Sequence, residues 1–260
     1  MTTTPLAVDW GDDGVCRATL MRPGAGNSLS ADLVAALEAI VEEGAVRRPR
    51  LMVLRGEGRH FCTGFDLSRL DEESDDSLLA RFCRIELMLQ KVHRAPFPTL
   101  AIAHGRTVGT GADGADLFAA CTHRVAAPGT QFAFPGASGF GLVLGTRRLV
   151  QRVGAERARR WVETGVGVGF DEALASRLAT GALADPSGAD DIARCLAAGL
   201  PPAPGQPFLG SALDAADPVH DHVDLALLVR SAAVPGLRAR IAAYVERGKQ
   251  RSSSSSSSAS

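Results

Sequence analysis

Short runs of apolar residues alternate along the first half of the chain with longer segments whose apolar residues recur at helical spacing. Residues 15–20 and 51–55 are typical of buried strands. Residues 30–43 between them predict an amphipathic helix, for which Ser28 or Ser30 is a suitable cap. The cycle of strand and helix then repeats, so the sequence predicts a mixed α/β fold.

The second cycle leads into a glycine-rich turn. A helix is expected over residues 78–93, followed by a strand within 96–105 and another helix over 112–120. Apolar spacing then predicts one long helix over residues 145–164. We therefore expect the core to end near Leu183.

Three regions follow from these patterns. Residues 1–183 form the predicted core, and residues 184–249 form a C-terminal helical region that begins with a loose connection rich in Pro, Gly, Ala and Asp. Its last helix, over 225–248, is expected to break at Pro235. Residues 250–260 are almost entirely serine, cannot bury a core, and are predicted to be disordered.

The composition narrows the class of protein. A chain of 260 residues that is 45% hydrophobic and 22% charged can fold as one globular unit, and a net charge of -1 provides no basic surface for nucleic acid. Five cysteines at unpatterned spacings argue against a disulfide framework or a zinc site. No apolar stretch reaches the roughly 18 residues of a membrane span. We expect a cytoplasmic protein without a metal, a membrane or a nucleic-acid partner.

Two glycine-bearing turns, at residues 62–67 and 109–116, each follow an apolar strand. Glycine lets the backbone adopt positive φ and allows a ligand to approach the amides closely. The second turn also opens a helix, whose free N–H groups favour negative charge. Two converging amides of this kind would form an oxyanion hole, so the turns predict polarisation of a carbonyl group.

The order and spacing of these motifs resemble those of a known family. GxGRxFCxGxDL at 56–67, AIxGxxxGxGAxxAxxAC at 101–121 and the HRVAA that follows are similar to motifs of the enoyl-CoA hydratase/isomerase, or crotonase, family. The likeness extends over roughly residues 15–185. It implies an α/β fold built as a spiral of ββα units, a homotrimer or hexamer, and a coenzyme A thioester bound as substrate, with no separate cofactor.

The resemblance also implies which residues form the site. The first oxyanion amide would belong to Phe65, and the second to Thr110 or, with a shifted alignment, to Gly111. Arg22 lies in a segment that borders coenzyme A in the family, where a cation suits the phosphates, although a solvated surface charge is the alternative for it. The other implied substrate contacts are Ala25, Cys62, Gly64, Asp66, Leu67, Pro135 and Gly136.

The acid–base residue is ambiguous because Gly-Ala-Asp occurs twice in succession. Counting forward from Gly111 assigns the family's first carboxylate to Asp113, whereas counting back from Cys121 assigns it to Asp116. Either aspartate could instead serve only to complement the helix dipole. The family's second carboxylate position falls on Gly136, so one of the two acids of a hydratase is absent.

These features favour an acyl-CoA-binding enzyme that stabilises a thioester enolate, nominally an enoyl-CoA hydratase or isomerase of fatty acid metabolism. The glycine at the second acid position keeps a different interpretation open, namely a crotonase-fold protein without hydratase activity. Such a protein would act as an acyl-CoA-binding subunit, as a thioester hydrolase or as an enzyme that cleaves C–C bonds.

Overall fold

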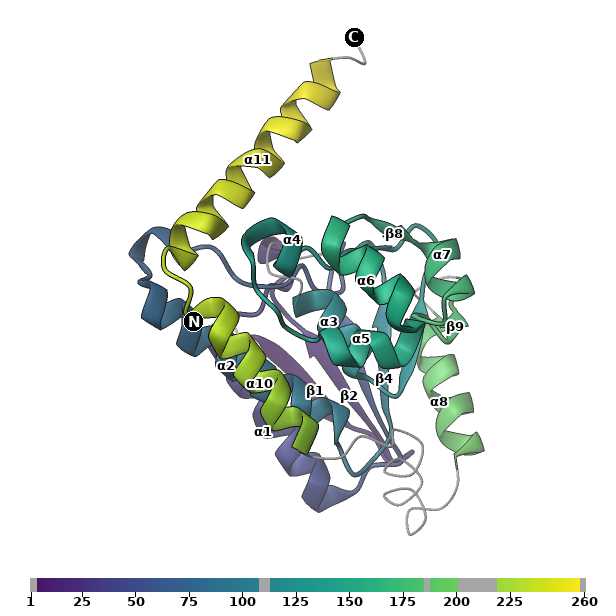
Figure 1. Ribbon diagram of the computed structural model, residues 1–260. Helices are drawn as coiled ribbons and strands as arrows, with labels where there is room; N and C mark the ends of the chain where they lie inside the picture. Colours follow the sequence, from purple (N-terminus) through teal and green to yellow (C-terminus); the bar gives the residue numbers. More distant parts are fainter. Residues whose placement is uncertain (1–3, 108–112, 185–187, 201–218, 258–260) are drawn as a thin grey trace.

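A six-stranded sheet lies at the centre of the molecule, with strand order β1-β2-β3-β4-β6-β9 (Figure 1). The computed structural model describes residues 4–107, 113–184, 188–200 and 219–257. A smaller sheet has the order β5-β7-β8. The strands are β1 (Leu6–Trp10), β2 (Val15–Leu20), β3 (Leu51–Gly56), β4 (Thr99–Ala103), β5 (Arg106–Thr107), β6 (His123–Ala126), β7 (Gln131–Phe132), β8 (Val168–Gly169) and β9 (Gly181–Ala182).

Helices connect the strands and cover the sheet. Two short 3-10 turns, η1 (Pro23–Ala25) and η2 (Leu70–Glu72), accompany α-helices of very different lengths. The α-helices are α1 (Ala31–Arg47), α2 (Asp75–His93), α3 (Asp113–Ala120), α4 (Gly136–Phe140), α5 (Thr146–Val153), α6 (Ala155–Thr164), α7 (Phe170–Ala175), α8 (Ala189–Gly199), α10 (Val219–Ala232) and α11 (Leu237–Ser257).

The large sheet combines a hairpin with parallel strands. β1 and β2 pair antiparallel across a tight turn, where Gly14 adopts a φ of 75°. From β2 onward every neighbouring pair is parallel, and parallel pairing needs a long crossover such as the α1 connection. α1 begins where predicted, because the side chain of Ser30 accepts a hydrogen bond from Leu33 N–H. The predicted α/β class is confirmed.

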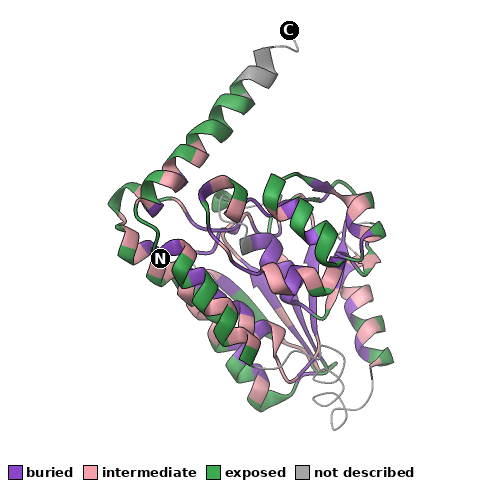
Figure 2. Ribbon diagram, in the orientation of Figure 1, coloured by how far each residue is buried: buried purple, intermediate pink, exposed green. Residues whose placement is uncertain are grey.

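Alternate strand residues point to opposite faces of the sheet, and both faces are buried in the central strands, whereas β1 at the edge is mostly exposed (Figure 2). On β3, Met52 and Leu54 belong to the larger apolar cluster, to which α1 and α2 contribute. Leu51 and Val53 point the other way, into a smaller cluster with α8. Within the described ranges, no helix is both long enough and apolar enough to cross a membrane.

Three elements differ from the expectations. The single helix predicted over 145–164 is two helices, because Gly154 adopts a φ of 81° and ψ of 158° between α5 and α6. α8 occupies part of the predicted loose connection and packs on the sheet through Ala189, Ala193 and Ala197. α11 continues to Ser257, into the serine-rich run for which the sequence predicted disorder.

The last two helices meet at a break that contains Pro235, as the sequence predicted. Asp75, in the first turn of α2, anchors the far side of this break. Its carboxylate accepts hydrogen bonds from the backbone N–H groups of Gly236 (2.7 Å), Leu237 (3.1 Å) and Arg238 (2.8 Å). From this anchor α11 projects away from the body of the protein (Figure 1).

We predict that Asp75→Ala loosens the base of α11 without unfolding the core. Three N–H groups at the start of α11 would lose their acceptor, because a helix cannot satisfy its first donors internally. Hydrogen exchange should therefore accelerate in residues 236–241. Asp76→Ala is the matched control, since Asp76 lies in the same turn and is exposed. Equal exchange in the two variants would contradict the anchoring role.

Candidate active site

The first glycine turn is tied to the segment before α1. Gly64 adopts a φ of 88°, which favours glycine, and its carbonyl oxygen accepts a hydrogen bond of 2.7 Å from Leu29 N–H. Thr63 N–H donates to Gly26 O at 2.9 Å. Cys62 is buried at the base of the turn. These bonds fix the direction in which the next amide, that of Phe65, points.

Phe65 presents a backbone N–H that has no acceptor among the described residues. Its ring is buried and stacks on Phe82, with centroids 4.3 Å apart. The guanidinium carbon of Arg81 lies 4.1 Å from the centroid of the Phe65 ring. An amide that is held in place and not already bonded can stabilise a developing oxyanion.

The start of α3 lies directly against this turn. A Cβ atom on Gly114 would lie 2.2 Å from Cys62 O and 3.1 Å from Gly64 N, so only glycine permits the contact. The first turn of α3 therefore borders the Phe65 amide. Thr110 and Gly111, for which the sequence predicted the second amide, lie outside the described residues, as does the side chain of Asp113.

Asp116 is buried in the middle of α3, with 1% of its surface exposed. Its Oδ2 has no hydrogen-bond partner in the described part of the chain. A Cβ atom on Gly145 would lie 1.9 Å from Asp116 Oδ1, so that glycine makes room for the carboxyl group. Burial raises the pKa of Asp116 well above its usual value, and the charge of Arg148 only partly opposes this effect. Burial therefore favours the neutral, protonated form of this carboxyl group.

Asp116 and Gly136 line the same small cavity, although they are far apart in sequence. The cavity measures about 10 Å³, roughly the space of one water molecule. Its walls contain no second carboxylate among the described residues. The other lining residues are Phe134, Ala137, Leu142, Leu144, Thr146, Leu149 and Val162.

A much larger groove, of about 1250 Å³, runs past the first glycine turn. The structure brings several of the predicted site residues to its walls, and residues of α11 line the groove as well. Pro135 lines this groove and Gly136 lines the small cavity, so consecutive residues border the two spaces. The predicted contacts in the groove wall are Ala25, Phe65, Asp66, Leu67 and Pro135.

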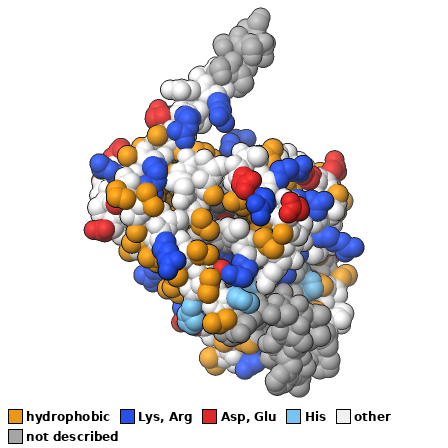
Figure 3. All heavy atoms as spheres, viewed as in Figure 1, with side chains coloured by type: hydrophobic (Ala, Val, Ile, Leu, Met, Phe, Trp, Pro, Cys, Tyr) orange, Lys and Arg blue, Asp and Glu red, His pale blue; other side chains and the backbone are white. Residues whose placement is uncertain are grey.

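Basic side chains gather along one side of the groove. Arg247, Lys249 and Arg251 of α11 line it, together with Arg106 at the start of β5. Figure 3 shows Lys and Arg side chains along the described part of the projecting helix. Arg106 and Lys249 were not predicted as site residues. Their positions depend on how α11 and β5 meet in three dimensions, which no local pattern in the sequence reveals.

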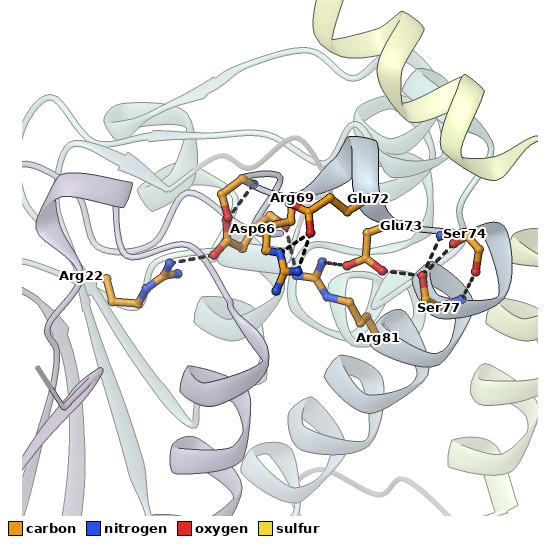
Figure 4. A network of polar contacts seen from close by, with 9 residues as sticks. Arg22, Asp66, Arg69, Glu72, Glu73, Ser74, Ser77 and Arg81 are labelled. Atoms are coloured by element: carbon orange, nitrogen blue, oxygen red, sulfur yellow. Dashed lines mark hydrogen bonds and ion pairs between the residues drawn. The ribbon is translucent and has the colours of Figure 1, made fainter. Parts of the chain in front are cut away.

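Arg22 is held by a polar network beside the first turn (Figure 4). Its guanidinium forms an ion pair of 2.7 Å with Asp66 and donates to Ser28 O at 2.5 Å. Burial raises the pKa of Asp66, but hydrogen bonds from Ser68 and Arg22 outweigh burial, so the net shift is downward. The structure thus shows Arg22 linking two loops, and its predicted role as a phosphate ligand stays a prediction.

Arg81 extends this network to the start of α2. It donates to Asp66 O at 3.0 Å and forms an ion pair of 2.5 Å with Glu73. Glu73 in turn accepts a hydrogen bond from Ser77, next to the Ser74 cap of α2 (Figure 4). The acidic segment at residues 71–76 is therefore held in place through Glu73. Among the described residues, no cluster of His, Cys, Asp or Glu is arranged to hold a metal ion.

Residues 15–204 of the chain match the family model described as enoyl-CoA hydratase/isomerase. The chain is 34% identical over 183 residues to a probable enoyl-CoA hydratase, echA6, of Mycobacterium leprae, which covers 66% of this chain and 70% of that protein. It is 30% identical over 173 residues to the enoyl-CoA isomerase/hydratase fer4 of Mycosarcoma maydis, which covers 62% of each protein.

Solved structures share the fold over nearly the whole chain. A Bordetella parapertussis protein that carries the enoyl-CoA hydratase/isomerase name has a TM-score of 0.85 at 39% identity, covering 94% of this chain and 99% of that one. An enoyl-CoA hydratase of Mycobacterium smegmatis has a TM-score of 0.73 at 26% identity, covering 94% and 97%. The predicted crotonase-type fold is confirmed.

Proposed function

Because the chain belongs to the enoyl-CoA hydratase/isomerase family, we propose that it binds an acyl-CoA thioester in the large groove and stabilises the thioester enolate. The observation that carries the proposal is the contact between the Phe65 turn and the start of α3, which Gly114 alone makes possible. An acyl group that extends along the groove to Pro135 would bring its reacting carbons towards Gly136 and the small cavity beside Asp116.

Two amides would hold the thioester oxygen. Phe65 N–H is one of them. The second would come from the segment that opens α3, either Thr110 or Gly111 as the sequence predicts, or Asp113, whose neighbour Gly114 contacts the first turn. Each such donor typically contributes about 10²–10³-fold to turnover.

Asp116 would move the proton. In hydration, a water oxygen adds to the β carbon of a 2-enoyl thioester, and the electrons pass to the thioester oxygen. The enolate then takes a proton from Asp116 at its α carbon, and the Asp116 carboxylate recovers a proton from the added water. One carboxyl group thus completes the cycle, and the cavity beside Gly136 offers space for one water molecule.

The test is a turnover assay with 2-enoyl and 3-enoyl coenzyme A esters, with products identified by mass spectrometry. We expect conversion to the 3-hydroxyacyl ester or to the shifted enoyl ester. Calorimetry on the same preparation separates binding from chemistry. Binding of the esters without conversion of any of them would contradict the enzymatic proposal.

That outcome would favour the second candidate, a crotonase-fold protein that binds acyl-CoA without hydrating it. Gly136 supports this candidate, because no second carboxylate lines the described walls of the cavity. Release of free coenzyme A would instead indicate thioester hydrolysis, and a shortened carbon skeleton would indicate C–C bond cleavage.

We predict that the groove cations attract the coenzyme A phosphates. Arg106→Gln and Lys249→Gln should each weaken binding about two- to fivefold, because an exposed ion pair typically contributes less than about 1 kcal/mol. The effect should shrink at high salt. Arg194→Gln, at an exposed position of α8, is the control. Calorimetry at low and high salt makes the comparison, and salt-independent changes would argue against phosphate recognition.

The oligomeric state and the cellular compartment that the sequence predicts are also part of this proposal. Val219, Val223 and Leu227 are 52%, 43% and 43% exposed and recur every four residues along α10, which supports a homotrimer or hexamer. Sedimentation measures the assembly directly. None of the five cysteines, all of which lie in the described part of the chain, forms a disulfide, which supports a reducing, cytoplasmic compartment.

A further inference from the structure

Three ionisable side chains from three helices are buried together behind the candidate site. Asp116 of α3, Glu86 of α2 and Arg148 of α5 are 1%, 1% and 4% exposed. Glu86 and Arg148 form a two-pronged ion pair, with Nη1–Oε1 and Nη2–Oε2 distances of 2.7 and 2.6 Å. Gln90 donates a further hydrogen bond of 2.9 Å to Glu86 Oε1. Asp116 has no such pairing in the described structure.

The ion pair with Glu86 uses both terminal nitrogens of Arg148. One donor of Arg148 and one acceptor of Asp116 are not used by it. Arg148 Nε, a donor, and Asp116 Oδ2, an acceptor, are both buried without a hydrogen-bond partner among the described residues. α3 packs against α5, and the two charged groups act on each other electrostatically. Arg148 is therefore the cation available to an ionised Asp116, but Glu86 already neutralises it.

We propose that Glu86 is a positioning residue for the acid–base step, because its pairing with Arg148 withholds the guanidinium charge from Asp116 and keeps that carboxyl group protonated. This inference rests on the proposed role of Asp116 as proton donor. A buried charge without a counter-charge is costly, so the neutral form of Asp116 is the stable one while the pair is intact.

The neighbouring charges do not change this balance. Asp224 of α10 faces Arg147 of α5, with Nε–Oδ distances of 2.9 and 3.0 Å, and the two neutralise each other. The charged groups that act on Asp116 are Arg148 from α5 and Glu86 from α2. Asp224 also acts on Arg148 through space, but its hydrogen bonds go to Arg147, so removing the Glu86 charge leaves Arg148 without its directly paired counter-charge.

The decisive variant is Glu86→Gln, which keeps the shape of the side chain and removes its charge. Arg148 would then favour the carboxylate of Asp116, and an opposite charge typically lowers a carboxyl pKa by about one unit or more. A smaller fraction of Asp116 would then carry the donated proton at a given pH, so turnover should fall by up to about tenfold per unit of lowered pKa and recover at lower pH. Glu42→Gln is the matched control, because Glu42 is an exposed acid of α1.

Asp116 is observed directly through the infrared C=O stretch of its protonated carboxyl group, identified as the band that Asp116→Asn removes. In Glu86→Gln this band should vanish at lower pH than in the wild type, while Glu42→Gln leaves it unchanged. An unshifted band with altered turnover would overturn the inference and leave the proposed function standing. A shifted band in a protein that converts no enoyl ester would overturn the proposed function and the catalytic role of Glu86, and would leave only its electrostatic effect on Asp116.

A second variant keeps the test meaningful if Glu86→Gln folds poorly. In the double variant Glu86→Leu/Arg148→Met, neither charge is present, and apolar replacement of a buried ion pair is often tolerated. In this double variant, the infrared C=O band of Asp116 should disappear at the same pH as in the wild type or at a higher pH. A downward shift in this variant would overturn the inference, because no cation would remain to cause it.

Discussion

Asp116→Asn is expected to lower turnover of the acyl-CoA substrate by about 10²–10⁴-fold, the usual contribution of a positioned acid or base. Asparagine has nearly the same shape as aspartic acid and still fits beside Gly145, but it cannot give up a proton to the enolate. Substrate affinity should change little, because the groove and its basic residues are untouched. Steady-state kinetics combined with calorimetry separates the two effects.

The same substitution should leave the protein as stable as before or make it more stable, in a pH-dependent way. Burial raises the pKa of Asp116 in the folded protein. The folded state therefore binds more protons than the unfolded state above the ordinary carboxyl pKa of about 4, and the wild type loses stability as pH rises from there towards the folded pKa. Asparagine has no ionisable proton. The free energy of unfolding of Asp116→Asn should therefore rise relative to that of the wild type over this pH range, which denaturant unfolding measures.

Asp113→Asn is the comparison that separates the two copies of Gly-Ala-Asp. We expect it to retain most of the turnover, because Asp113 lies at the first position of α3 whereas Asp116 lines the cavity. A large loss in Asp113→Asn with none in Asp116→Asn would transfer the role to Asp113. Unchanged turnover in both variants would remove the acid–base assignment altogether.

Gly114→Ala is expected to reduce turnover by about 10²–10³-fold, the effect of losing one oxyanion donor. The added Cβ would lie 2.2 Å from Cys62 O, so the start of α3 and the Phe65 turn must move apart. Alanine improves helix propensity by about 1 kcal/mol, but overpacking against backbone typically costs about 1–3 kcal/mol. A lower kcat with a modest fall in stability is therefore expected.

Gly199→Ala is the control for this change. Gly199 is the last residue of α8, and a Cβ there meets nothing within 4 Å. It should match the wild type in kcat. Full activity in Gly114→Ala would show that the two turns need not touch, and would count against the oxyanion hole at this contact.

Local patterns were sufficient for the elements that are repeated and strongly amphipathic. The strands at 15–20 and 51–55, the Ser30 cap and the break at Pro235 all follow from short-range rules of periodicity and backbone geometry. The division of α5 from α6 does not follow from these rules, because apolar spacing across residues 145–164 is compatible with one helix and does not reveal the positive φ of Gly154. α8 was missed because its small alanine face resembles a loop in composition and becomes apolar packing only against the sheet.

The site could be predicted as far as chain order determines it. The motifs place the two glycine turns, and counting back from Cys121 gives Asp116 as one of two candidate acids, with Asp113 as the other. The structure places Asp116 beside Gly136, and its catalytic role stays a prediction. The pairing of Glu86 with Arg148 joins residues 62 positions apart, and the approach of α11 to the first turn spans most of the chain. Such contacts depend on tertiary packing and leave no local signal.

The contact of Gly114 with the first turn also bears on how this chain can change over generations. The two Gly-Ala-Asp triplets are identical, so loss of either one yields the same protein. In both cases the surviving triplet stands at the same distance before Cys121, with its glycine and its aspartate in the places of Gly114 and Asp116. Related genes are therefore expected to vary in the number of triplets while conserving the copy next to the helix.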